Sequence, residues 1–407
     1  MTTLDFFSKI FRGDRVIWMI FLFLMVISAV EMYSASSTLT YDMDYWQPVA
    51  RHWMFLAVGL GITMAFHALP PKYFSALGIV LPLTWAGLVA AMFVGSNVNG
   101  AHRYIAGFQP SELAKLSLIV LTAWLLGKRK EGNANTIFWW IMGATAVTCA
   151  LILKENLSTA FILALVVYLM LWIGQMPWKK MLWITVIALV TCGSAYSFIK
   201  FTPVEILNSA LVNKVLPRAD TWQSRLNQPK EDVYSPHFKI TDENLQEAHA
   251  KIAIANGGIF GKLPGNGIER HILPQAYSDM IYAIIIEELG LIVGGFGVML
   301  LYLTLLLRAG VIARRTNNSF FKLLVMGAGL IIVVQALVNM AVSVGLIMTG
   351  QTLPLISRGG TSIWVICVYF GILLSVSRYD NPRGVQTEEA IEEEFQEEQQ
   401  ISQTEQL

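Results

Sequence analysis

The 407-residue chain contains ten long apolar runs, and these runs limit what it can fold into. Most reach the roughly 20 residues that an α-helix needs to cross the hydrocarbon core of a bilayer. Backbone polar groups find no water there, so each run is predicted to be a helix. Charged residues make up only 14% of the chain, against about 25% in soluble domains. The sequence therefore predicts an all-α polytopic membrane protein.

The predicted transmembrane helices cover residues 15–33, 53–69, 73–94, 111–127, 137–153, 157–173, 181–199, 280–307, 320–348 and 362–377. Basic residues such as Lys128, Arg129 and Lys130 gather in short loops on one side, which orients both termini toward the cytoplasm. We divide the chain into a cytoplasmic segment 1–14, a membrane domain 15–379 and a tail 380–407. The tail is rich in Glu and poor in apolar residues, which predicts a disordered cytoplasmic segment.

One connection is much longer than the others. Residues 200–278 link the seventh and eighth predicted spans on the outer side, and they include an amphipathic stretch at 243–255. A polar loop of this length in a compact protein usually carries function. Asp279 follows it at the edge of the next span. A carboxylate in that position is costly to desolvate unless it faces polar surroundings, so Asp279 is the first candidate for a catalytic residue.

Further polar groups lie at the outer ends of other predicted spans. Glu112 and Lys115 are three residues apart, share a helix face and are predicted to form a structural ion pair. Arg103 lies in an outer loop and is a candidate for holding a phosphate. In the segment 350–362, proline and glycines interrupt the helix, so it must line a polar space or be buried in protein. That segment offers the hydroxyls and guanidinium of Ser357, Arg358 and Thr361.

Two more segments leave alternatives open. Residues 154–159 hold a charge pair and two hydroxyls, which turn and cap chemistry explains. The glycines of 257–267 permit either tight turns or a close approach of backbone N–H groups to an anion. The net charge of +1 gives no electrostatic argument for nucleic acid. Together the polar groups predict a phosphate-bearing lipid substrate handled at the outer face.

Four motifs, in order, resemble the SEDS family, the FtsW/RodA peptidoglycan polymerases, from about residue 14 to 378. They are Gln109-Pro-Ser-Glu-Leu-Ala-Lys, Gly258-Ile-Phe-Gly-Lys, Leu273-Pro-Gln-Ala-Tyr-Ser-Asp with Ile286-Glu-Glu-Leu-Gly, and Leu353-Pro-Leu-Ile-Ser-Arg-Gly-Gly-Thr-Ser. The chain departs from the family pattern where Tyr277 replaces a usual His and Arg358 a usual Tyr. The first change puts an imidazole role in doubt, and the second adds an anion contact.

The resemblance implies polymerisation of lipid II into glycan strands, with release of undecaprenyl diphosphate. It implies that Asp279 is the general base, and it raises the possibility of a divalent cation, Mg²⁺ or Mn²⁺. Expected partners are a class B penicillin-binding transpeptidase and other division-site membrane proteins, at the septum of the bacterial inner membrane. The substrate contacts that we predict are Arg103, Arg358, Ser357, Thr361, Arg218 and Arg225.

Three other functions stay open at the level of sequence. The extended N-terminal segment, the acidic tail and the stretch around Arg218, Trp222 and Arg225 favour a division role, but an elongation polymerase of the RodA type is the nearest alternative. A lipid II flippase needs polar groups through the whole membrane depth, whereas here they gather near the outer ends. A non-catalytic scaffold for the transpeptidase has no need for Asp279.

Overall fold

The computed structural model describes residues 12–35, 46–98, 101–105, 107–154, 156–203, 222–224, 240–241, 244–273, 276–347 and 349–379. The first half contains α2 (Arg15–Ala35), α3 (Trp46–Ala68), η2 (Pro71–Phe74), α4 (Ser75–Ile79), α5 (Leu81–Val94), β1 (Ser96–Val98), β2 (Ala101–Tyr104), α6 (Pro110–Gly127), η3 (Glu131–Asn133), α7 (Ala134–Leu153), α8 (Leu157–Ile173) and α9 (Trp178–Phe201). The second half contains α13 (Leu245–Gly257), η4 (Glu269–His271), α14 (Ile281–Gly290), η5 (Leu291–Gly297), α15 (Val298–Arg315), α16 (Ser319–Ser343) and α17 (Thr361–Tyr379).

Every predicted span falls on a helix, which confirms a helical multi-pass membrane protein. Among the described residues, eight helical stretches are long and apolar enough to cross a membrane. The pair formed by 71–79 and 81–94 is bent by 45° and would make a ninth, and α8 is a shorter apolar helix of 17 residues. The count of ten therefore stays a prediction. The strands β1 and β2 form an antiparallel hairpin that the sequence did not predict.

Two predicted spans differ from the observed helices. The span at 73–94 bends near Val80, where Pro82 in the first turn of α5 cannot donate a backbone hydrogen bond to the preceding turn. The span at 280–307 consists of α14, η5 and α15, and Gly290 interrupts it with a φ of 79°. Residues 281–315 are therefore not one straight helix.

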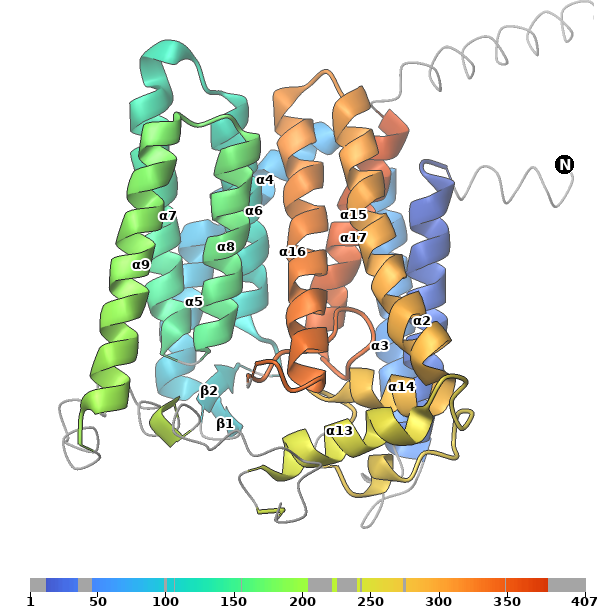
Figure 1. The fold of residues 1–407 in the computed structure, drawn as a ribbon. Helices are drawn as coiled ribbons and strands as arrows, with labels where there is room; N and C mark the ends of the chain where they lie inside the picture. The colour runs from blue at the N-terminus through green and yellow to red at the C-terminus, as the bar shows by residue number, and fades with distance from the viewer. Residues whose placement is uncertain are drawn as a thin grey trace, which may run out of the picture.

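The helices run side by side, and α13, α14 and the hairpin gather at one end of the bundle, which we call the cap end (Figure 1). The predicted amphipathic stretch at 243–255 is confirmed as α13, which packs along α14. At the opposite end, the backbone N–H of Asp14 donates to Oγ of Ser377 over 2.9 Å. The start of α2 and the end of α17 are therefore neighbours.

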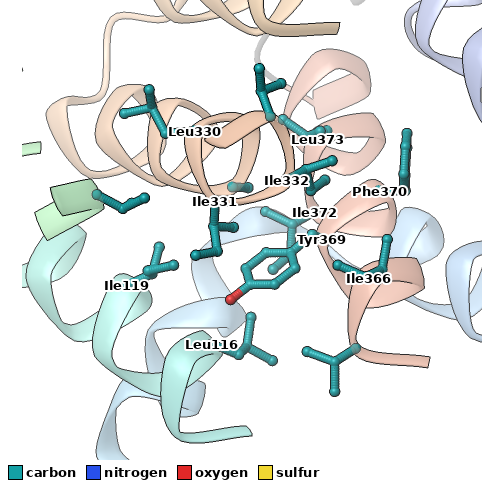
Figure 2. Packing of buried hydrophobic residues seen from close by; sticks show 14 of the residues in the cluster. Leu116, Ile119, Leu330, Ile331, Ile332, Ile366, Tyr369, Phe370, Ile372 and Leu373 are labelled. Atoms are coloured by element: carbon teal, nitrogen blue, oxygen red, sulfur yellow. The ribbon is translucent and has the colours of Figure 1, made fainter. Parts of the chain in front are cut away.

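The core lies where α6, α16 and α17 meet. Leu116 and Ile119 of α6, Ile331 of α16 and Tyr369 of α17 pack together there (Figure 2). A Cβ on Gly327 would lie 2.7 Å from Ile119 Cγ2, so α16 approaches α6 closely. Because lipid tails are as apolar as these side chains, such close packing is the main force that joins the helices. The rigid core carries α16 and α17, whose cap-end residues build the candidate site.

Candidate functional site

Asp279 lies half-buried at the cap end, two residues before the first residue of α14. Oγ of Ser278 donates to Oδ1 of Asp279 over 3.2 Å. Oδ2 faces Gly350, where an ideal Cβ would lie only 2.9 Å away. Because residue 350 has no side chain, the carboxylate can lie directly against the backbone of the segment that leads to α17.

The segment 349–360 is hydrogen-bonded to the residues that precede Asp279. The backbone N–H of Arg358 donates to the carbonyl of Tyr277 over 2.9 Å. Oγ of Ser357 donates to the carbonyl of Ser278 over 2.7 Å and accepts from the N–H of Leu353 over 2.7 Å. Two motifs about 80 residues apart in sequence thus form one unit, which brings Arg358 to the neighbourhood of the acid.

The side chain of Arg358 adds positive charge to this unit. Its guanidinium carbon lies 5.3 Å from the ring centroid of Tyr277, within cation–π range. Burial lowers the pKa of the Arg358 guanidinium, Tyr277 raises it, and the like charge of Arg51 on α3 lowers it again. An arginine stays protonated despite such shifts. Two guanidiniums therefore influence each other here, an arrangement that an anionic group would stabilise.

Two other predicted polar segments join the same region. The N–H of Gln109, at the start of α6, donates to Oγ1 of Thr361 over 3.3 Å. Nε2 of Gln351 donates to Oγ1 of Thr159 over 2.8 Å, and Oγ of Ser158 is hydrogen-bonded to Oγ1 of Thr349. The segments around 109 and 156 thus meet the segment 349–361, which passes beside Asp279 at the cap end, although sequence reasoning treated them separately.

The ion pair predicted on α6 is present in the structure. Nζ of Lys115 lies 2.9 Å from Oε2 of Glu112, and both side chains are buried. Nζ of Lys115 also donates to Oε1 of Gln335 on α16 over 3.2 Å. Nε2 of Gln335 donates to the carbonyl of Thr352 over 3.2 Å. The pair therefore connects α6 and α16 to the segment beside Asp279, as a structural role requires.

The remaining predicted contacts have different positions. Ser357 and Thr361 are 2% and 5% exposed, and their hydroxyls make the bonds within the protein described above. Both hydroxyls therefore hold the segment in place, and the expectation that they face the substrate receives no support from their geometry. Arg103 belongs to β2, but its side chain lies outside what the structure describes. Arg218, Arg225 and the tail 380–407 also lie outside the described residues.

The glycine-rich segment binds backbone carbonyls of α14. The N–H of Lys262 donates to the carbonyl of Glu287 over 2.9 Å, and that of Leu263 donates to Glu288 over 2.8 Å. Gly261 has a φ of 79°, and a Cβ there would lie 2.3 Å from the Glu288 carbonyl oxygen. Of the two sequence interpretations, the structure supports tight turns and close backbone packing. These N–H groups are used by the protein and bind no anion.

A second polar cluster, which sequence reasoning missed, joins α14 to α2. Nη1 of Arg270 donates to Oγ of Ser34 over 2.6 Å and lies 3.8 Å from Oε1 of Glu288. The hydroxyl of Ser34 donates to the same carboxylate. Oε1 of Glu287 accepts from the N–H of Ile268 over 3.0 Å. The members of this cluster come from three separate sequence segments and form no motif. The only sequence signal was the pair of glutamates in an apolar helix.

In the described part of the chain, no group of three or more His, Cys, Asp or Glu side chains could hold a metal ion. Asp279 is the one carboxylate that we predicted for the reacting centre. The expected Mg²⁺ or Mn²⁺ would therefore need further ligands, such as water or phosphate oxygens.

A family model for cell cycle proteins, FtsW/RodA/SpoVE, matches residues 14–382. The chain belongs to this family. It is 31% identical to the probable peptidoglycan glycosyltransferase FtsW of Geobacter metallireducens over 386 residues, which cover 91% of this chain and 96% of that protein. It is 31% identical to the protein of the same name from Taylorella equigenitalis, covering 82% and 88% of the two chains. The predicted family is thereby confirmed.

Two solved structures share the fold. One is a chain of a peptidoglycan synthase complex that coordinates polymerization and crosslinking, with a TM-score of 0.68 at 22% identity over 91% of this chain and 99% of that one. The other is the rod shape determining protein RodA of Thermus thermophilus, with a TM-score of 0.60 at 21% identity over 91% and 98%. At these identities the likeness establishes the polytopic helical fold alone.

Proposed function

We propose that this protein is a peptidoglycan glycosyltransferase that polymerises lipid II at the outer face of the cytoplasmic membrane. Its membership of the FtsW/RodA/SpoVE family and the names of its relatives support this activity. One observation about the site carries the proposal. Hydrogen bonds from Ser357 and Arg358 to the carbonyls of Ser278 and Tyr277 hold the segment that carries Arg358 beside the residues that lead to Asp279.

In the proposed reaction, a sugar hydroxyl of the acceptor attacks the anomeric carbon of the donor. The bond between that carbon and the diphosphate oxygen breaks, and undecaprenyl diphosphate leaves with the electron pair. Asp279 takes the hydroxyl proton as general base, a role that requires an ionised carboxylate within hydrogen-bond reach of the hydroxyl.

The leaving diphosphate carries charge that has to be stabilised as the bond breaks. Arg358 is the described residue best suited to this task, since a guanidinium grips phosphate through two parallel hydrogen bonds. Arg103, Arg218 and Arg225 remain further candidates from the sequence. A requirement for Mg²⁺ or Mn²⁺ also stays a prediction; if bound beside Asp279, such a cation would supply further charge stabilisation.

The cellular role that we propose is cell division, with a class B penicillin-binding transpeptidase as partner. The FtsW names of the relatives support the division role, and the likeness to a peptidoglycan synthase complex is compatible with such a partner. Localisation to the septum of the bacterial inner membrane, with both termini cytoplasmic and contacts to other division-site membrane proteins, belongs to the same proposal.

The test is polymerisation of lipid II by purified protein together with its transpeptidase partner. Asp279→Asn is nearly isosteric but cannot accept the proton, so the variant should form no glycan strands while keeping its melting temperature and its partner. Lys322→Ala changes an exposed residue at the start of α16 and serves as the control, with full activity retained. Strand formation by Asp279→Asn at the wild-type rate would remove Asp279 from the catalytic role, whereas wild-type protein that forms no strands would favour a flippase or a scaffold.

A further inference from the structure

Two amide side chains interrupt the apolar face of α16 near the cap end. Gln335 and Asn339 are four residues apart, which places them on one face of the helix. Gln335 is 3% exposed and Asn339 is 0% exposed. Gln335 is linked to the ion pair on α6, as described above. Asn339 reaches the candidate catalytic residue itself.

The amide nitrogen of Asn339 binds two carbonyl oxygens. Nδ2 donates to the backbone oxygen of Asp279 over 2.9 Å and to that of Gln351 over 2.6 Å. An amide NH₂ group carries two protons, so one side chain can serve both acceptors at once. A residue of a core helix thus joins the backbone that carries the acid to the segment that passes beside it.

The bond to Gln351 matters because of the residue before it. Gly350 is the neighbour of Oδ2 of Asp279, with an ideal Cβ position 2.9 Å from that oxygen. Holding the carbonyl of Gln351 therefore also fixes the backbone against which the carboxylate lies. Asn339 consequently controls the carboxylate from two sides, through the backbone of Asp279 and through the position of Gly350.

The oxygen at the other end of the Asn339 amide is in an energetically unfavourable position. Oδ1 of Asn339 is buried and has no hydrogen-bond partner among the described residues. Rotating the amide by half a turn would bring Oδ1 against the two carbonyl oxygens, so the observed orientation is the favourable one. Buried polar atoms without partners are uncommon and call for an explanation. The explanation here is that the amide keeps the two hydrogen bonds that Nδ2 donates to Asp279 and Gln351.

We propose that Asn339 is a positioning residue for glycosyl transfer, which holds the Asp279 carboxylate against Gly350 in the orientation that accepts the hydroxyl proton. The inference rests on the function proposed above, because it assigns Asn339 to the same reaction. Asn339 acts through Asp279 and needs no contact with lipid II.

Steady-state kinetics of lipid II polymerisation by the full chain with its transpeptidase test the proposal. Asn339→Ala should lower kcat by roughly 10- to 100-fold, the scale for a misplaced catalytic group, while KM changes by less than about twofold because Asn339 itself makes no contact with lipid II. Asn339→Leu keeps the size, removes the donor without adding a charge and should be at least as slow. It also carries the test if Asn339→Ala does not fold. Ser343→Ala, one turn further along α16 and equally buried, is the control and should keep the wild-type kinetics.

A double variant separates positioning from a general loss of structure. Gly350→Ala introduces a Cβ that displaces the carboxylate from the opposite side. Since both changes act on one group, Asn339→Ala combined with Gly350→Ala should slow the reaction by less than the product of the single effects. A raised KM, a full product of the two effects, or a wild-type kcat for both Asn339 variants while Asp279→Asn is inactive would overturn the positioning role. Wild-type protein that forms no glycan strands would instead overturn the proposed function and this inference with it.

Discussion

Lys115 and Glu112 carry opposite charges inside a helix that is otherwise packed in the core. Their mutual attraction and the bond from Lys115 to Gln335 offset the cost of removing both charges from water. The three-residue spacing was enough to predict the pair, because side chains at that spacing share a helix face. The partner Gln335 lies 220 positions away in sequence, so only the packing of α16 on α6 reveals it.

Breaking this pair should destabilise the protein. Lys115→Ala leaves the Glu112 carboxylate buried without its cation, which costs about 3–5 kcal/mol. The melting temperature in detergent, followed by circular dichroism, should fall accordingly. Replacing both residues, Glu112→Gln with Lys115→Met, removes both charges and should cost less than the single change. A Lys115→Ala variant with the wild-type melting temperature but no polymerase activity would point to contact with the substrate instead.

At the scale of elements, hydrophobic length predicted the helices well, and turn chemistry was harder to predict. The run at 157–173 coincides with α8, whereas the run at 280–307 conceals the break at Gly290. An apolar pattern reports burial in lipid or protein, and it does not register a change of backbone direction at one glycine. For the same reason the glycine-rich segment stayed ambiguous, since its acceptors are carbonyls of α14, which no sequence pattern displays.

Packing of α13 and the glycine-rich segment on α14 predicts a sharp difference between two glycines. A Cβ on Gly257 would lie 2.2 Å from the carbonyl oxygen of Ile286, so Gly257→Ala should force the two helices apart and cost about 1–3 kcal/mol. Gly193, on α9, has no atom of the described residues within 4 Å of its ideal Cβ. Gly193→Ala should therefore raise helix stability by about 0.5–1 kcal/mol. Melting temperatures of the two purified variants compare them directly, and equal values would contradict the close approach.

For the whole molecule, the contacts of Asp14 join the beginning and the end of the bundle. Oδ1 of Asp14 accepts from the N–H groups of Val16 and Ile17, which caps α2. Its carboxylate pairs with the guanidinium of Arg308 on α15, and its N–H donates to Ser377 on α17. From the sequence we predicted only that Asp14 belongs to a cytoplasmic N-terminal segment. A single charge before a span gives no sign of a partner almost 300 residues away.

Asp14 should therefore stabilise the bundle more than other charged residues at this end. Asp14→Ala removes the cap, which costs about 1 kcal/mol, and it also leaves Arg308 without its carboxylate, so the loss should exceed the cap alone. Asp14→Asn retains a capping oxygen but not the charge and should give an intermediate melting temperature. The exposed Lys322, at the start of α16, provides the control, since Lys322→Ala should stay within about 0.5 kcal/mol of wild type. If Asp14→Ala and Lys322→Ala melt together, the contacts of Asp14 do not hold the first and last helices in place.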